Sequence, residues 1–101
     1  MTEEIKNIID GDAVRVLIVD DSQTERMFLH KLLLRAGVRA ELAESGNKCI
    51  ALTDAKRYDL ILMDEVMPGI GGAETMRKLR TSGISKNRET PAVLLGAQTA
   101  E

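Results

Sequence analysis

The sequence contains a single cysteine, Cys49, and no apolar run that approaches the roughly 18 residues of a membrane-spanning helix. One cysteine cannot form a disulfide within the chain, and a cysteine-based zinc site needs several thiolates. An excess of positive charge is also missing, because the formal net charge is −2, which disfavours nucleic-acid binding by this segment. The chain starts with the acidic stretch 2–4, so we expect no signal peptide, no membrane contact and a cytoplasmic location.

The composition is that of a folded domain. Hydrophobic residues make up 44% and charged residues 30% of the 101 residues, which is typical of one globular domain or part of one. Residues 1–12 are expected to form an N-terminal arm, and residues 13–101 the main domain. Ile5, Ile8 and Ile9 have helical spacing, so the arm is either a short helix that packs on the domain or a frayed segment.

Two apolar runs in the main domain end in carboxylates. Residues 14–19 read VRVLIV and are followed by Asp20 and Asp21, while residues 60–63 read LILM and are followed by Asp64. An apolar run that stops at a charged residue is typical of a buried parallel strand that delivers a side chain to the end of a sheet. If the two strands are parallel neighbours, three carboxylates meet at one sheet edge.

Extended and helical patterns alternate along the rest of the chain. This alternation predicts an α/β fold with a doubly wound parallel sheet, whose ligands bind at the carboxyl ends of the strands. The remaining expected elements are strands at 39–43 and 92–95, and helices from about 22 to 36, from 46 to 56 and from 71 onward, with a polar loop at 81–90.

The first helix has the clearest local signals. Ser22 and Glu25 have the spacing of a capping box, in which each side chain bonds the backbone N–H of the other residue. His30 is interpreted as an exposed helix residue, because no partner motif surrounds it. The predicted buried stripe of this helix consists of Phe28, Leu29, Leu32, Leu33 and Ala36.

Three converging carboxylates need a partner. Two like charges about 4 Å apart repel by roughly 4 kcal/mol at an effective dielectric constant near 20. An oxygen-only, carboxylate-rich site suits Mg²⁺, which also neutralises an incoming phosphoryl group and lets a carboxylate act as a nucleophile. A single aspartate after a strand is usually a turn or N-cap residue, but a doublet and a singlet after two strands form a less common pattern.

The motifs as a set resemble a known family. Residues 16–22 (VLIVDDS), 59–64 (DLILMD) and 67–69 (MPG), followed by Gly72, closely resemble the receiver domain of two-component response regulators. The resemblance extends over about residues 13–97 in order and spacing. It implies a flavodoxin-like, CheY-like fold with the strand order 2-1-3-4-5.

The resemblance also implies a role for each residue of the acidic set. Asp64 is then the acceptor of a phosphoryl group from a phosphohistidine on a histidine kinase or phosphotransfer protein. Asp21, Asp64 and the backbone carbonyl of Val66 are the implied direct Mg²⁺ ligands, and Asp20 acts through water. The implied role is that of a regulator rather than an enzyme, and an attached output domain or an effector protein responds to the phosphorylated state.

Two departures from the family pattern keep alternatives open. The Ser or Thr that ends the family's fourth strand corresponds here to Gly96, and Thr99 lies three residues too late to replace it. The chain also stops before the fifth strand, its Lys and the last helices, so the expected domain is incomplete at its C-terminus. An open fourth strand leads us to expect one of two situations: the chain is a fragment of a longer protein, or it completes its sheet with another chain, for example as a homodimer.

The same departures define a second functional hypothesis. A degenerate receiver could act as a protein-interaction module that is insensitive to phosphorylation. A third class, the phosphohydrolases with an aspartate nucleophile, is disfavoured because it requires a second acid two residues after the nucleophile, where this chain has Val66.

Overall fold

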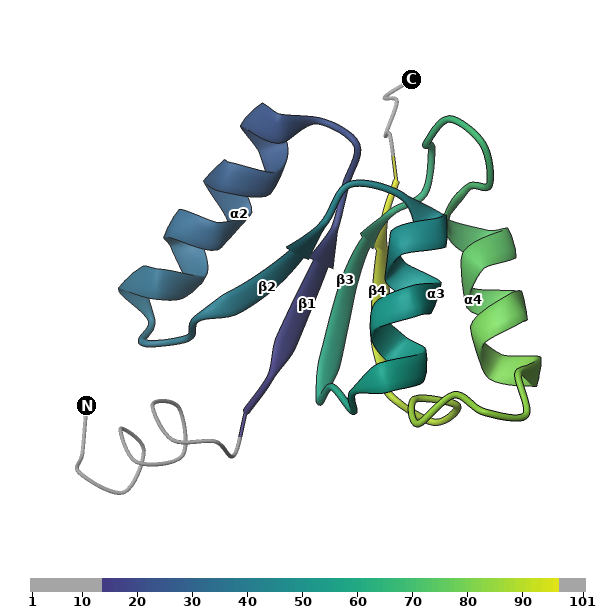
Figure 1. The fold of residues 1–101 in the computed structure, drawn as a ribbon. Helices are drawn as coiled ribbons and strands as arrows, with labels where there is room; N and C mark the ends of the chain where they lie inside the picture. Colours follow the sequence, from purple (N-terminus) through teal and green to yellow (C-terminus); the bar gives the residue numbers. More distant parts are fainter. Residues whose placement is uncertain (1–13, 97–101) are drawn as a thin grey trace.

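The computed structural model describes residues 14–96, in which a parallel four-stranded sheet lies between α2 on one face and α3 and α4 on the other (Figure 1). The predicted arm and Thr99 lie outside the described residues. The elements are strands β1 (Val16–Val19), β2 (Ala40–Ala43), β3 (Leu60–Asp64) and β4 (Ala92–Leu95), and helices α2 (Gln23–Arg35), α3 (Gly46–Ala55) and α4 (Gly72–Thr81).

The sheet has the order β2-β1-β3-β4, and all neighbouring strands are parallel. This arrangement confirms the predicted doubly wound parallel sheet. Val16 pairs with Ala40 of β2 on one side and with Leu60 of β3 on the other, so β1 and β3 are direct neighbours. The helix α2 connects β1 to β2 on one face of the sheet and α3 connects β2 to β3 on the other, which places the topological switch point between β1 and β3.

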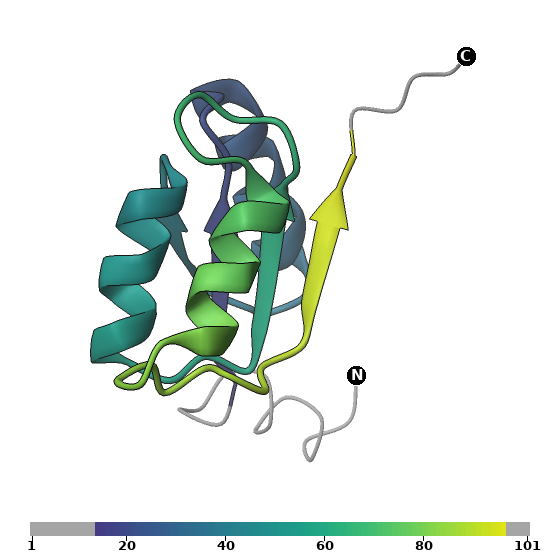
Figure 2. The same ribbon diagram turned by 90° about the vertical axis from the view of Figure 1, so that its right-hand side faces the viewer.

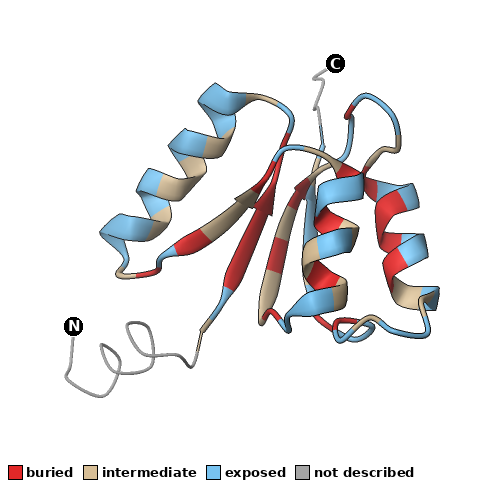
Figure 3. Cartoon of the chain, in the orientation of Figure 1, coloured by how far each residue is buried: buried red, intermediate tan, exposed pale blue. Residues whose placement is uncertain are grey.

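Alternate residues of β1 belong to the hydrophobic core on opposite faces of the sheet. Leu17 and Val19 are buried under α3 and α4, and Val16 and Ile18 are buried on the side of α2. Figure 3 shows that the buried positions concentrate in β1, β2 and β3 and in α3 and α4. Cys49 of α3 is fully buried, and burial raises the pKa of its thiol to about 12, which confirms its prediction as a small core residue.

The predicted buried stripe of α2 is partly wrong. Leu29 and Leu33 are half-buried against the sheet, but the side chains of Phe28 and Leu32 are 62% and 44% exposed, and Ala36 is also exposed. No residue of α2 is fully buried. The physical reason is that α2 packs on β1 and β2, and no described element covers its remaining apolar flank.

His30 also differs from its prediction as an exposed residue. The side chain is half-buried, and its Nδ1 atom is enclosed without a hydrogen-bond partner among the described residues. None of the helices described between residues 14 and 96 is long and apolar enough to cross a membrane.

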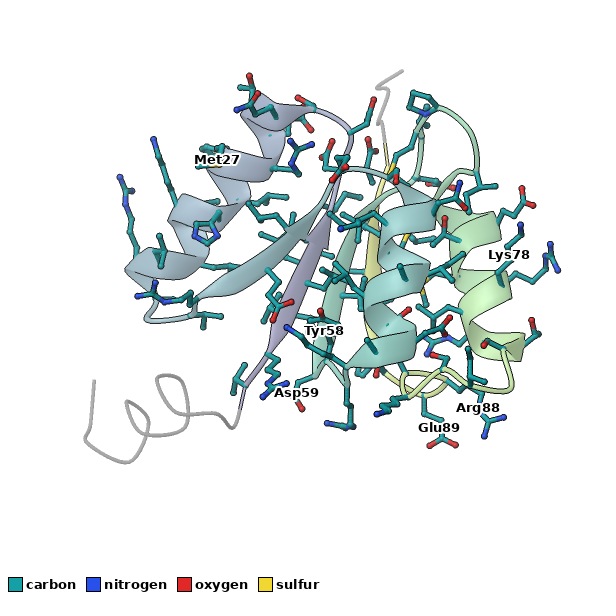
Figure 4. All side chains as sticks on the ribbon, in the orientation of Figure 1. Met27, Tyr58, Asp59, Lys78, Arg88 and Glu89 are labelled. Atoms are coloured by element: carbon teal, nitrogen blue, oxygen red, sulfur yellow. The ribbon has the colours of Figure 1, made fainter. Side chains whose placement is uncertain are left out.

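The polar loop before β4 is anchored by one buried side chain. Asn87 donates from Nδ2 to the carbonyls of Thr53 and Lys56, and its Oδ1 accepts from the N–H of Tyr58 and the hydroxyl of Thr90. The loop therefore closes the amino edge of the sheet. Figure 4 shows its exposed residues Arg88 and Glu89 at this edge, together with Tyr58 and Asp59.

Candidate functional site

The acidic set lies at the carboxyl edge of the sheet. Asp20 and Asp21 directly follow β1, and Asp64 is the last residue of β3. Because Val19 pairs with Met63 across these two strands, the residues that follow them are brought together. Side-chain oxygens of the three aspartates lie within 4.8 Å of one another, as the sequence predicted.

Asp20 is fixed at this edge by several bonds. Its side chain is buried, with only 2% of the residue exposed, and its Oδ1 accepts a hydrogen bond of 2.9 Å from the N–H of Ser22. Its carbonyl accepts a bond of 2.7 Å from Nη1 of Arg26, and its N–H donates to the carbonyl of Ala43. The backbone and the first helical turn of α2 therefore set the orientation of this carboxylate.

Asp64 is positioned by the turn that follows β3. The N–H of Val66 donates to its Oδ1 over 3.2 Å. A Cβ atom at Gly72 would lie only 2.7 Å from the carbonyl oxygen of Asp64, so a glycine lets α4 start directly against the end of β3. Partial burial raises the pKa of the Asp64 carboxyl, and the negative charges of Asp20 and Asp21 raise it further.

Glu25 is a fourth acid near the site that the sequence reasoning assigned only to helix capping. The hydroxyl of Ser22 accepts from the N–H of Glu25, as predicted, but the N–H of Ser22 donates to Asp20 instead of Glu25. The Glu25 carboxylate therefore has no capping bond to Ser22. The charge of Asp20 raises the pKa of Glu25, with smaller contributions from burial and from Asp64 and Asp21.

The donor set is compatible with a hard divalent cation. Three carboxylates supply only oxygen atoms, which is the ligand chemistry of Mg²⁺. Their mutual repulsion disfavours the fully charged site in the absence of a cation. Val66 is exposed directly after this edge, and the assignment of its carbonyl as a ligand stays a prediction.

The comparison with protein families decides the identity of the domain. The family model of the response regulator receiver domain matches residues 16–101. The chain belongs to this family. It therefore has the receiver fold of two-component signal transduction, and residues 14–96 contain four strands in the CheY-like order with no fifth strand among them.

Individual receiver proteins are similar to this chain in sequence and in structure. Protein PilH of Pseudomonas aeruginosa is 40% identical over 79 residues, which cover 78% of this chain and 61% of PilH. The N-terminal domain of a receiver protein from Methanoculleus marisnigri has a TM-score of 0.77 and 31% identity, and the match covers 86% of this chain and 69% of that one. This receiver chain spans less than two thirds of the curated relatives it matches, from 8% of the sensor histidine kinase AruS of Pseudomonas aeruginosa to 61% of PilH.

One solved relative carries a metal. The response regulator TrrA of Thermotoga maritima, in complex with Mg(2+)-BeF, has a TM-score of 0.75 and 30% identity, over 85% of this receiver chain and 71% of that one. Receiver domains bind Mg²⁺ at an acidic pocket, and this receiver has such a cluster in Asp20, Asp21 and Asp64.

Gly96 lies at the same edge of the sheet as the acidic set. Asp64 pairs with Leu95 of β4, and the N–H of Glu65 donates to the carbonyl of Leu95. Gly96 is therefore the first residue beyond the carboxyl end of β4, one strand away from Asp64. It brings no hydroxyl group to this position.

Proposed function

We propose that this receiver domain accepts a phosphoryl group on Asp64 from a histidine kinase or a phosphotransfer protein. An attached output domain or an effector protein then responds to the phosphorylated state. The observation that carries this proposal is the convergence of Asp20, Asp21 and Asp64 within 4.8 Å at the ends of two neighbouring strands. A cytoplasmic location and a homodimer formed through β4 stay predictions.

The ligand set proposed for Mg²⁺ consists of Asp21, Asp64 and the carbonyl of Val66, with Asp20 acting through a water molecule. Bound Mg²⁺ would offset the charge of the carboxylates and of the incoming phosphoryl oxygens. The bond from Ser22 holds Asp20 toward the site, which keeps its carboxylate available although the residue is buried.

The proposed nucleophile is the carboxylate of Asp64. The N–H of Val66 orients the carboxylate of Asp64 at the end of β3. A carboxylate oxygen of Asp64 forms the new bond to phosphorus, while the bond from phosphorus to the donor nitrogen breaks and its electron pair stays on the imidazole. The product is an acyl phosphate on Asp64.

Phosphorylation can be tested with acetyl phosphate and Mg²⁺, followed by intact-mass measurement. Wild-type protein should gain the mass of one phosphoryl group, and Asp64→Asn should gain none. Glu65→Gln is the matched control, because it removes the neighbouring exposed carboxylate and should leave labelling unchanged. Equal labelling of wild type and Asp64→Asn would overturn the assignment.

A second candidate function is a receiver that binds a partner without responding to phosphorylation. The observation in its favour is Gly96, which has no hydroxyl to contact a phosphoryl group and couple it to β4. Amide chemical shifts before and after acetyl phosphate separate the two functions. Shifts confined to the acidic edge favour the insensitive module, whereas shifts along β4 and α4 favour a working switch.

A further inference from the structure

A polar pocket with a volume of about 410 Å³ lies at the amino edge of the sheet, at the opposite end of β3 from the acidic set. Strands rise about 3.3 Å per residue, so the first and last residues of β3 are about 13 Å apart. Figure 2 shows the loop before β4 passing below the carboxyl ends of α3 and α4. Residues of this loop and one residue before β3 line the pocket: Arg57, Ser85, Lys86, Arg88, Glu89 and Thr90. All of them precede β4, so the open strand edge takes no part in the pocket.

Buried hydrogen bonds hold the wall of this pocket in place. Asn87 is fully buried and bonds the end of α3 and the N–H of Tyr58. The N–H of Asn87 also donates to Oγ of Ser85 over 3.0 Å, which fixes Ser85 at the pocket. Nη1 of Arg80 donates to the carbonyls of Asn87 and Arg88, over 3.2 and 2.9 Å. The pocket is therefore pre-formed, which lowers the entropic cost of binding a ligand.

The pocket carries an excess of positive charge. Three cations and one carboxylate, that of Glu89, line it, for a net charge of +2 in a chain whose net charge is −2. The side chains of Lys86 and Arg88 form no ion pair with any residue between 14 and 96. Arg57 pairs with Asp59 over 2.9 Å, but its side chain is 65% exposed, and such pairs are weak. All three cations are therefore available to an anionic ligand.

We propose that this pocket binds a small anion that carries two or more linked phosphate groups. The guanidinium groups of Arg57 and Arg88 present donors in a fork that matches two phosphate oxygens, and Lys86 adds a compact positive charge. Oγ of Ser85 accepts from Asn87, and its own hydroxyl hydrogen has no acceptor in the part of the chain that the structure describes, so it can donate to the ligand. The volume of about 410 Å³ lies within the range of about 300–1,000 Å³ that is usual for small-molecule sites.

The residue types of the pocket indicate that the phosphate groups carry the recognition. All the lining residues are polar or charged, so an apolar ligand would find no matching surface. The chain has no tryptophan, Tyr58 is its only tyrosine and is fully buried, and its only phenylalanine, Phe28, lies on α2. No aromatic side chain of the pocket can therefore stack on a nucleotide base, and inorganic diphosphate and a nucleoside diphosphate should bind alike. This inference is independent of phosphorylation at Asp64, which lies at the other edge of the sheet.

Titration of amide chemical shifts in the full chain, in metal-free buffer, tests the site. Inorganic diphosphate and ADP should both shift the amides of residues 57 and 85–90, with similar affinity. Lys86→Gln combined with Arg88→Gln should weaken diphosphate binding at least about tenfold, because bonds from charged donors to phosphate are strong. The matched control is Lys31→Gln with Arg35→Gln, which removes two exposed cations of α2 and should leave the affinity nearly unchanged.

Four outcomes would overturn the proposal. The absence of shifts at residues 57 and 85–90 would show that the pocket takes no diphosphate. Equal weakening by the two double substitutions would show that binding follows the net charge of the chain alone. Equal affinity for citrate would show that any multivalent anion suffices, and equal affinity for adenosine would show that the phosphate groups are not recognised. Labelling by acetyl phosphate occurs at the other edge, so the test of Asp64 succeeds or fails independently of this one.

Discussion

The backbone N–H of Ser22 donates a hydrogen bond of 2.9 Å to Oδ1 of Asp20. One bond therefore links the acidic site to the start of α2, because Ser22 is also the N-cap residue of that helix. It takes the donor that the predicted capping box would give to Glu25. The N-cap residue therefore orients the carboxylate of Asp20. The carboxylate of Glu25 has no capping bond and remains near the site.

Removal of one carboxylate from the site should stabilise the metal-free protein. Asp64→Asn keeps an acceptor for the N–H of Val66 but removes the negative charge near Asp20 and Asp21. Asp21 is exposed and Asp64 is half-buried, so solvent screens this edge nearly as bulk water does, and each pair of like charges costs about 1 kcal/mol instead of the roughly 4 kcal/mol of a less solvated site. We therefore expect a gain of about 1–2 kcal/mol. Urea unfolding in the presence of a chelator measures this gain. Glu65→Gln should give no comparable gain, and a loss of stability in Asp64→Asn would contradict the prediction.

The gain from Asp64→Asn should depend on pH. The folded state raises the pKa of Asp64 above its usual value of 3.8, so the folded state binds the proton more tightly than the unfolded state. The contribution of Asp64 to wild-type stability therefore falls as pH rises through the window above 3.8, and the asparagine variant lacks this contribution. The difference between the two proteins should be full at neutral pH and should shrink toward pH 4. A constant difference across this range would contradict the charge argument.

Much of this molecule could be predicted from local sequence patterns. Apolar runs before Asp20 and Asp64 were sufficient to predict two parallel strands and one acidic edge, because strand burial and strand termination are local signals. The exposure of Phe28 and Leu32 could not be predicted in this way. Helical periodicity identifies an apolar side, but only the tertiary arrangement decides whether another element covers it.

The anchoring role of Asn87 could not be predicted from local sequence patterns either. A polar residue in a loop such as 81–90 is usually exposed, and its partners here are 29 to 34 residues away for three of its four bonds. No local pattern identifies bonds over such separations. The sequence could therefore predict the loop but not the residue that holds it.

Asn87→Ala should destabilise the whole domain. The substitution leaves the carbonyl of Lys56 and the N–H of Tyr58 without their partner, while the carbonyl of Thr53 keeps its bond from the N–H of Lys86. Unpaired buried groups cost about 1–3 kcal/mol each, and water entry at the loop offsets part of this, so we expect a loss of about 3 kcal/mol. Thermal or urea unfolding measures it. The exposed Asn47→Ala is the control and should change stability by less than about 0.5 kcal/mol.

For the substitution Gly46→Ala, helix propensity and packing predict opposite changes in stability. Alanine is about 1 kcal/mol better than glycine inside a helix, so propensity alone predicts that Gly46→Ala stabilises α3. The structure predicts the opposite, because the added Cβ would overlap Oγ1 of Thr75 and lie 2.7 Å from Cγ1 of Ile70, where α3 approaches the start of α4. We expect a loss of about 1–3 kcal/mol from this overpacking, measured by urea unfolding.

A double-mutant cycle with Thr75 identifies the source of that loss. Thr75→Ala removes the Oγ1 atom that the new methyl group meets, so Gly46→Ala should cost less in this background than in wild type. The same loss in both backgrounds would show that the contact with Thr75 is not responsible. Gly83→Ala is the control, since a Cβ atom there meets nothing within 4 Å, and it should leave the unfolding free energy nearly unchanged. A stabilised Gly46→Ala protein would mean that α3 can move away from α4 at little cost, because the propensity gain would then exceed the packing strain.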